Sequence, residues 1–156
     1  MTHKEPKFAP KIALYQPDIP QNTASIIRTC SCLGIMLEII EPCGFIINDR
    51  KFKRVVMDYY DAKNIQFYKS PEDFFISKRN TRIILMTTKS KKSYKEFQFK
   101  KNDTVLFGRE SSGVPTNVHK KVSHRLIIPM MNKKRSLNLS SSVSIVVSKI
   151  LNQTNF

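Results

Sequence analysis

Short apolar runs alternate with helical patterns along nearly all of the 156 residues, and this alternation restricts the fold more than any other feature. We predict strands at residues 11–15, 36–40, 65–68, 82–86, 104–107 and 126–128, and helices at residues 22–33, 50–57, 71–78, 114–120 and 139–151. Continuous β-rich runs are typical of strands buried on both faces. The sequence therefore predicts one α/β domain over residues 1–156, with a parallel sheet covered by helices on both faces. Residues 1–10 are expected to be a flexible extension.

Several residues predict where helices begin and end. Asn22 precedes an apolar helical stripe and is a candidate N-cap, while Gly34 follows the stripe and can supply the left-handed residue after its last turn. Ser70 and Pro71 combine a capping hydroxyl with proline at the first helical position. These boundaries divide the chain into short elements without an internal linker.

Glycine is scarce, and its positions exclude two common nucleotide sites. The four glycines cannot form the G-x-G-x-x-G loop of an ordinary dinucleotide-binding domain. Gly108 and Gly113 have the spacing of a phosphate loop, but Val114 and Pro115 stand where lysine and a hydroxyl residue are required. Any cofactor must therefore be held by another kind of loop.

The chain carries a formal net charge of +15, which favours a polyanionic partner such as nucleic acid. The excess is uneven, because residues 88–135 hold thirteen basic side chains and only three acids. The alternative is that these lysines only solvate loops. No apolar run is long enough for a membrane helix, and residues 1–10 lack the apolar stretch of a signal peptide, so we expect no membrane partner and a cytoplasmic location.

Cysteine and histidine do not form a metal pattern. Cys30, Cys32 and Cys43 include no C-x-x-C pair, and the three histidines share no spacing with them that would supply four ligands. We expect reduced thiols and no bound metal.

Three segments hold polar residues beyond what packing requires. The first contains Asn22 and Arg28; six helical residues turn through about 600°, so these two side chains are not stacked on one face. The second, residues 106–115, runs from a strand end into a glycine-containing loop, where parallel sheets bind ligands. The third, residues 127–143, crowds hydroxyls and amides before an apolar helix. Each also has a structural interpretation, as a helix cap or a turn.

In this order the three segments resemble the motifs of the SPOUT class of methyltransferases, and most closely its SpoU-type subfamily that methylates the wobble ribose of tRNA, often called TrmL. The resemblance extends from Ile12 to about Leu151 and includes Leu14-Tyr15-Gln16-Pro17 and Asn138-Leu139-Ser140. Three ordered motifs with matching intervals make it specific. It implies a fold that general topology rules treat as a rare exception, a deep C-terminal trefoil knot.

The resemblance also implies a cofactor and a reaction. The cofactor is S-adenosylmethionine, with no metal, and its methyl group goes to a ribose 2′-hydroxyl. The positions that match cofactor-contacting residues of the family are Met86, Gly108, Ile128 and Ser136. Those that match its other motif positions, and are the candidate catalytic residues, are Arg28, Asn22, Glu110, Ser136 and Asn138. Because a guanidinium stays protonated in proteins, we expect Arg28 to orient groups rather than to act as a general base.

The implied assembly is a homodimer in which Arg28 reaches the cofactor of the other subunit, and the implied substrate is the anticodon stem-loop of leucine tRNAs, methylated at wobble C34 or modified U34. The sequence departs from the family at three positions. Ala24 replaces a usual glycine, Ser141 a usual asparagine, and Ser148 a tyrosine linked to RNA binding. These departures affect substrate choice more than cofactor choice.

Two other functions stay open. The same motifs serve methyltransferases that modify rRNA or other tRNAs. A basic RNA-binding protein that keeps the fold without catalysis would carry the same charge.

Overall fold

A computed structural model describes residues 10–47, 49–56, 58–59, 63–131 and 136–154. The predicted N-terminal extension, residues 1–10, lies outside this part apart from Pro10, which is buried. Six parallel strands form one sheet in the order β3-β2-β1-β5-β4-β6. The strands are β1 (Lys11–Tyr15), β2 (Met36–Ile40), β3 (Ile65–Tyr68), β4 (Ile83–Met86), β5 (Thr104–Phe107) and β6 (His124–Leu126). The helices are α1 (Pro20–Leu33), α2 (Arg50–Val56), α3 (Pro71–Ser77), the 3-10 turn η1 (Tyr94–Glu96), α4 (Thr116–Lys121) and α5 (Leu139–Thr154).

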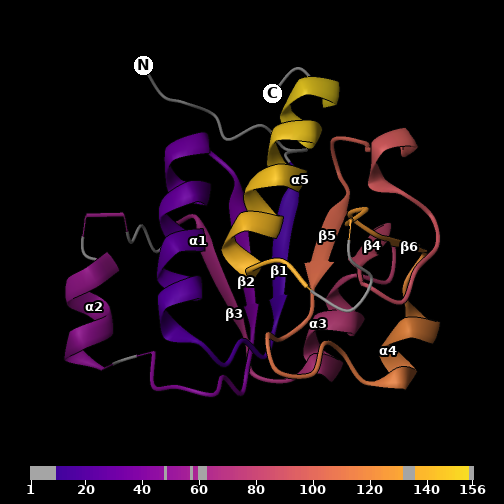
Figure 1. Ribbon diagram of the computed structural model, residues 1–156. Helices are drawn as coiled ribbons and strands as arrows, with labels where there is room; N and C mark the ends of the chain where they lie inside the picture. Colours follow the sequence, from indigo (N-terminus) through magenta and orange to yellow (C-terminus); the bar gives the residue numbers. More distant parts are fainter. Residues whose placement is uncertain (1–9, 48, 57, 60–62, 132–135, 155–156) are drawn as a thin grey trace.

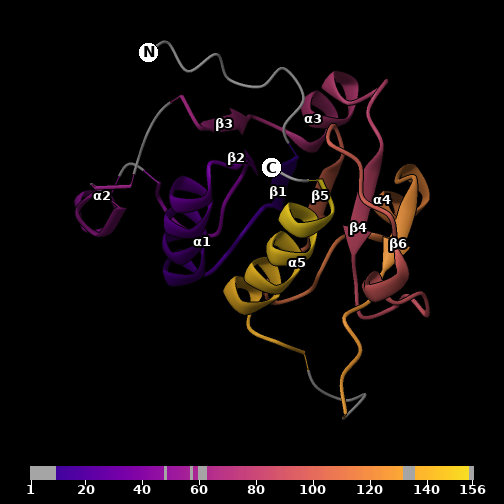
Figure 2. The same cartoon turned by 90° about the horizontal axis from the view of Figure 1, so that it is seen from above.

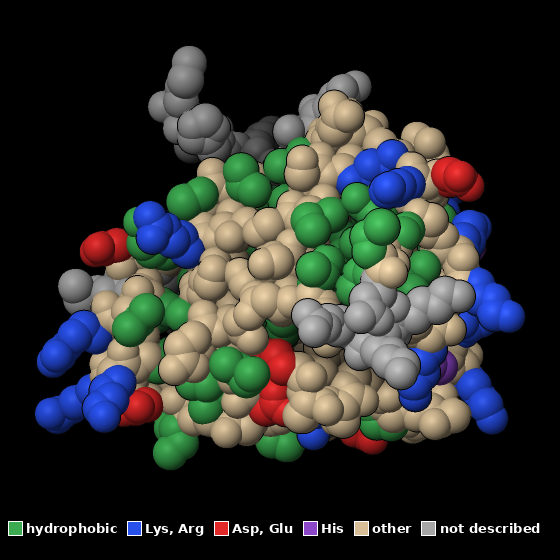
Figure 3. Space-filling view, in the orientation of Figure 1, with side chains coloured by type: hydrophobic (Ala, Val, Ile, Leu, Met, Phe, Trp, Pro, Cys, Tyr) green, Lys and Arg blue, Asp and Glu red, His purple; other side chains and the backbone are tan. Residues whose placement is uncertain are grey.

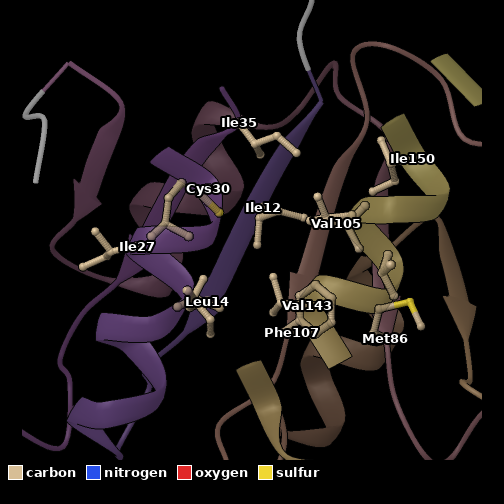
Figure 4. Packing of buried hydrophobic residues seen from close by; sticks show 14 of the residues in the cluster. Ile12, Leu14, Ile27, Cys30, Ile35, Met86, Val105, Phe107, Val143 and Ile150 are labelled. Atoms are coloured by element: carbon tan, nitrogen blue, oxygen red, sulfur yellow. The ribbon is translucent and has the colours of Figure 1, made fainter. Parts of the chain in front are cut away.

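Helices cover both faces of the sheet, as the sequence predicts. Successive side chains of a strand point to opposite faces, so Ile12 and Leu14 pack under α1 and α5 while Ala13 and Tyr15 face α3 and α4. Figures 1 and 2 show α1 and α5 side by side on one face and α3 on the other. Figure 4 shows the first of these layers, where side chains of α1, the central strands and α5 meet. Both faces of the sheet are buried under helices, which explains why the strands are continuous apolar runs.

Most predicted boundaries are confirmed. Gly34 adopts φ 66° and ψ 31° after α1, the left-handed conformation expected of it. Ser70 accepts a hydrogen bond from the Asp73 N–H at 3.2 Å and so caps α3. Among the described residues, no helix is long and apolar enough to cross a membrane.

The prediction that Asn22 caps α1 is wrong. The helix begins at Pro20 after Ile19, which makes no side-chain cap bond. Proline is favoured in the first turn because it lacks an N–H that would otherwise be unpaired. Asn22 is instead a buried residue inside the helix, so its amide is free to bond to other segments.

The predicted last strand, residues 126–128, is placed two residues too late. The strand is β6, His124–Leu126, whose register pairs Met86 with Leu126. Ile127 pairs instead with the loop after β4, because its N–H donates to the Lys92 carbonyl and its carbonyl accepts from the Tyr94 N–H. Ile128, the other apolar residue of the predicted strand, is partly buried against the main core cluster.

A buried ion pair joins β2 to the end of α3. Glu38 is fully buried, and its Oε1 lies 2.6 Å from the Lys78 Nζ and accepts from the Tyr68 hydroxyl at 3.1 Å. Burial lowers the pKa of Lys78, and the Glu38 carboxylate opposes that shift. Lys11 lies 3.9 Å from the same oxygen with 39% of its side chain exposed. Glu38 thus has a close cationic partner at the end of α3 and a more distant one on β1.

We predict that Lys78→Met lowers the free energy of unfolding by about 3–5 kcal/mol, because it leaves the Glu38 carboxylate buried without its close partner. Lys11→Met, which removes an exposed and longer contact, should cost less than about 1 kcal/mol. Urea denaturation measures both. Glu38→Leu combined with Lys78→Met should recover most of the loss, and a double variant as unstable as Lys78→Met alone would contradict this explanation.

Candidate active site

A cavity of about 450 Å³ opens at the carboxyl ends of β4 and β5, next to the segment that follows β6. Ligands of parallel α/β sheets bind at this edge, and the volume lies within the usual range of small-molecule sites. Three loops, the first turns of α1 and α5, and His119 of α4 line it. The lining includes Ile19, Asn22, Met86, Thr87, Gly108, Glu110, Ile128, Met130, Ser136 and Asn138.

Side-chain hydrogen bonds join the three segments that the sequence singles out. The Asn138 amide donates from Nδ2 to Asn22 Oδ1 at 2.9 Å, and the Asn22 Nδ2 lies 3.4 Å from Glu110 Oε1, which accepts from it. Glu110 Oε2 accepts the Asp18 N–H at 2.9 Å. We call Glu110, Asn22 and Asn138 the amide relay. It links positions 88 and 116 residues apart, so it fixes the loops relative to one another.

The last member of the amide relay also begins α5. Asn138 Oδ1 accepts from the Ser140 N–H at 2.9 Å and from the Ser141 N–H at 3.3 Å, which makes Asn138 the helix cap. Ser140 donates from its hydroxyl to Ser25 of α1 at 2.7 Å. One side chain therefore both caps α5 and bonds to Asn22 in the cavity wall.

The loop after β5 is closed on itself. Arg109 and Gly113 form an antiparallel bridge, with N–H to carbonyl distances of 2.9 and 3.3 Å. A Cβ at Gly108 would lie 2.7 Å from the Gly113 Cα, a distance that real side chains do not tolerate. Gly113 itself has open space but a φ of 66°. The two glycines thus serve different purposes, close approach and a left-handed turn.

Two carboxyls share one environment at the cavity wall. Hydrogen bonding with the Glu110 side chain holds the pKa of Asp18 below its usual value, while burial and the neighbouring Asp18 raise the pKa of Glu110. Ser111 donates its hydroxyl to Asp18 Oδ2. The opposite directions mean that, as the pH falls, Glu110 takes up a proton before Asp18 does.

The other side of the cavity mouth is basic. His119 lines it, and burial together with the charges of Lys89 and Arg125 lowers the pKa of His119. Arg125 donates to the His119 carbonyl. Figure 3 shows Lys and Arg side chains at two sides of one face, with acidic side chains between them. The described residues contain no group of three His, Cys, Asp or Glu side chains that could hold a metal.

Seven of the eight predicted site residues lie on the cavity lining. The seven are Asn22, Met86, Gly108, Glu110, Ile128, Ser136 and Asn138. Arg28 does not lie there. It is exposed on α1, and its guanidinium carbon is 4.9 Å from the centre of the Tyr59 ring. The rotation predicted between Asn22 and Arg28 accounts for this separation.

Two residues that the sequence does not single out contact predicted site residues, Asp18 beside Glu110 and Tyr59 beside Arg28. Asp18 belongs to a Gln-Pro-Asp turn, which conceals its pairing with Glu110, and its only signal is an acid close to the first motif. Tyr59 follows a charged helix and carries no local signal, because its contact with Arg28 joins residues far apart in the sequence.

The fold and this cavity define an enzyme class. Residues 9–148 match the SpoU rRNA Methylase family, and the chain belongs to that family. It is therefore an RNA 2′-O-methyltransferase by family.

Particular relatives resemble the chain over most of its length. The tRNA (cytidine(34)-2'-O)-methyltransferase of Beijerinckia indica is 42% identical over 144 residues, which cover 91% of this chain and 90% of that protein. A solved structure described as "Structural insights into the 2-OH methylation of C/U34 on tRNA" is 33% identical, with a TM-score of 0.86 and coverage of 94% and 96%. The Streptomyces viridochromogenes SpoU methyltransferase AviRb, solved with the cofactor AdoMet, has the same fold at 20% identity, with a TM-score of 0.81 and coverage of 98% of this chain and 61% of that one.

The two loop glycines give a testable distinction. Gly113→Ala should lower the free energy of unfolding by about 1–2 kcal/mol, the cost of a left-handed alanine. Gly108→Ala should cost more, because its methyl group meets backbone atoms that must move. Chemical denaturation of both variants measures the difference. Equal losses, or a smaller loss for Gly108→Ala, would show that the loop is not closely packed.

Proposed function

We propose that the protein transfers a methyl group from S-adenosylmethionine to the 2′-hydroxyl of the wobble ribose, C34 or modified U34, in leucine tRNAs. The observation that carries the proposal is the convergence of three separate motif segments on one cavity, joined by the amide relay. The curated relatives with a C34 tRNA activity support the substrate, since they match more than nine-tenths of this chain.

The residues present fit the cofactor. The cavity combines apolar side chains of Met86 and Ile128 with the polar groups of Glu110 and Ser136, as expected for a site that takes an adenosine with a charged end. S-adenosylmethionine, when bound, supplies a methyl group on a sulfonium sulfur. Loops after β4, β5 and β6 would hold it, in place of the glycine-rich fingerprint that the sequence lacks.

The chain's own residues would bind the cofactor and the acceptor ribose and orient them relative to each other. Asn22 and Asn138 are hydrogen-bonded to each other, so their role is to fix the cavity wall and its distance from α1. Glu110 holds the Asp18 backbone in the same way. Ser136 is exposed at the mouth and is available to an acceptor ribose. Alignment of two reactants in this manner can contribute about 7–11 kcal/mol to lowering a barrier.

Arg28 is proposed to act in the cavity of a partner subunit. Its exposure on α1, outside the cavity of its own chain, supports this arrangement. The α1 and α5 helices lie next to each other on one face and carry exposed Leu33 and Ile145, which a second copy could cover. Ser148, also exposed on α5, offers no aromatic ring to RNA where close relatives have tyrosine.

A knotted chain path belongs to the same proposal. The chain leaves β6 at the sheet edge and returns to α5 beside α1, so it must pass the connection between β4 and β5. That connection contacts α5 closely. Gln153 accepts from the Phe99 N–H and donates to the Phe97 carbonyl, both at 3.0 Å. These contacts support a C-terminal segment held within the loop.

We predict that Arg28→Ala keeps cofactor affinity and loses about 100-fold in kcat for tRNA, because a positioned cation is removed while the cavity is intact. Calorimetry and methyl-transfer assays measure the two quantities. Arg79→Ala, an exposed arginine after α3, is the matched control and should behave as the parent. Methylation by Arg28→Ala at the parent rate would contradict the assignment.

Subunit mixing tests whether Arg28 acts across a dimer. Ile128→Trp should fill the cavity, and dimers of either variant alone should be inactive. Hybrids of Arg28→Ala with Ile128→Trp contain one intact site, so co-purified mixtures should recover about a quarter of parent activity under two-fold symmetry. No recovery in confirmed hybrids would place Arg28 in its own subunit's site.

Binding of tRNA should depend on the basic cavity mouth. Lys89→Ala removes one phosphate-neutralising charge, so it should reduce the slope of log affinity against log salt by about one. Lys100→Ala is the matched control, because it lies at the amino end of β5, opposite the cavity. Fluorescence titrations over a range of salt measure the slopes, and equal slopes for both variants would exclude this surface.

The RNA that is methylated distinguishes the proposed tRNA activity from the two alternatives, an rRNA methyltransferase and a non-catalytic RNA-binding protein. Mapping 2′-O-methyl groups in tRNA and rRNA after deletion of the gene should show loss at position 34 of leucine tRNAs alone. Loss at an rRNA site would instead support an rRNA methyltransferase, and no loss together with no affinity for S-adenosylmethionine would support a non-catalytic RNA-binding protein.

A further inference from the structure

Arg28 is held by an aromatic ring. Its guanidinium carbon lies 4.9 Å from the centre of the Tyr59 ring. Among the described residues, no carboxylate forms an ion pair with Arg28. A carboxylate partner would neutralise the guanidinium and occupy its N–H donors, whereas a ring face attracts the cation and leaves the donors at its edge available.

Tyr59 is itself fixed in place. It is half-buried against the main core cluster, and its N–H donates to the Val56 carbonyl at 2.9 Å, which ties it to the end of α2. Helix α2 is anchored through buried Phe52 and Val56, and Phe52 contacts the Phe45 ring at 5.3 Å. The ring under Arg28 therefore rests on the core.

The helix that precedes Tyr59 is basic. Helix α2 packs against α1 and exposes four basic side chains, Arg50, Lys51, Lys53 and Arg54. Figure 3 shows Lys and Arg side chains projecting over the region of α2. The exposed acids Asp49 and Asp58 flank the helix, so basic side chains outnumber acids there by two, and a phosphate is attracted to such a surface.

We propose that Tyr59 is a positioning residue for Arg28: the ring holds the guanidinium in one orientation, with its donors free for a phosphate or ribose of the bound RNA. This inference deepens the proposed function and rests on it. The ring acts through Arg28, and α2 supplies the basic setting in which the RNA backbone approaches.

Tyr59→Leu removes the ring and should lower kcat about 3- to 10-fold, the range that a partly exposed cation–π contact supplies. The affinity for S-adenosylmethionine and the midpoint of thermal unfolding should change little. Tyr59→Phe keeps the ring and should recover most of kcat. Phe75→Leu, which removes the ring beside Lys121 on the opposite face, is the matched control and should leave kcat unchanged.

A second measurement does not depend on catalysis. In the free protein, the Arg28 Nε–H resonance should be shifted upfield by the ring current of Tyr59, and the shift should persist in Tyr59→Phe and disappear in Tyr59→Leu. An unshifted resonance in the parent would overturn the proposal, even if Tyr59→Leu fails to fold. A lost shift with parent kcat, or a Tyr59→Phe as slow as Tyr59→Leu, would also overturn it. If the parent methylates no tRNA while the shift is present, the proposed function fails and the contact stands.

Discussion

The amide relay is the interaction on which the site depends. Parallel strands bring the loops after β4, β5 and β6 to one edge of the sheet, but loops at the same edge are not thereby fixed relative to one another. The bonds from Asn138 to Asn22 and from Asn22 to Glu110 supply that constraint at 2.9 and 3.4 Å. Asn22 is the buried member, and an unpaired buried polar group is costly, so losing Asn138 or Glu110 removes one of the two partners of its amide.

The relay also relates the cavity to the two helices that cover one face. Asn22 belongs to α1 and Asn138 caps α5, so the cavity wall and the helix pair are parts of one unit. Arg28 projects from the same α1 helix, outside the cavity, onto the ring of Tyr59. The geometry thus separates a binding region made of loops from a charged region made of helix surfaces, which suits an enzyme that brings a small cofactor to a large RNA.

Much of this could be predicted from the sequence. Buried parallel strands produce apolar runs whatever their neighbours, so five of the six strands were predicted within about one residue. Gly34 and the Ser70-Pro71 pair determine helix ends by local backbone chemistry. Residues 126–128 were misplaced because an apolar run does not reveal whether it pairs with a strand or with a loop. The cap assigned to Asn22 was wrong for a related reason, since its partners lie about ninety and more residues away. The contacts of Asp18 and Tyr59 are long-range in the same sense.

A calorimetric titration of the parent protein with S-adenosylmethionine tests the central claim that three loops form one cofactor site. We predict saturable binding at one site per chain, and weaker binding in Asn138→Ala, which breaks the relay without touching the β-sheet. The absence of saturable heat with the folded parent protein, or equal affinity in both proteins, would contradict it.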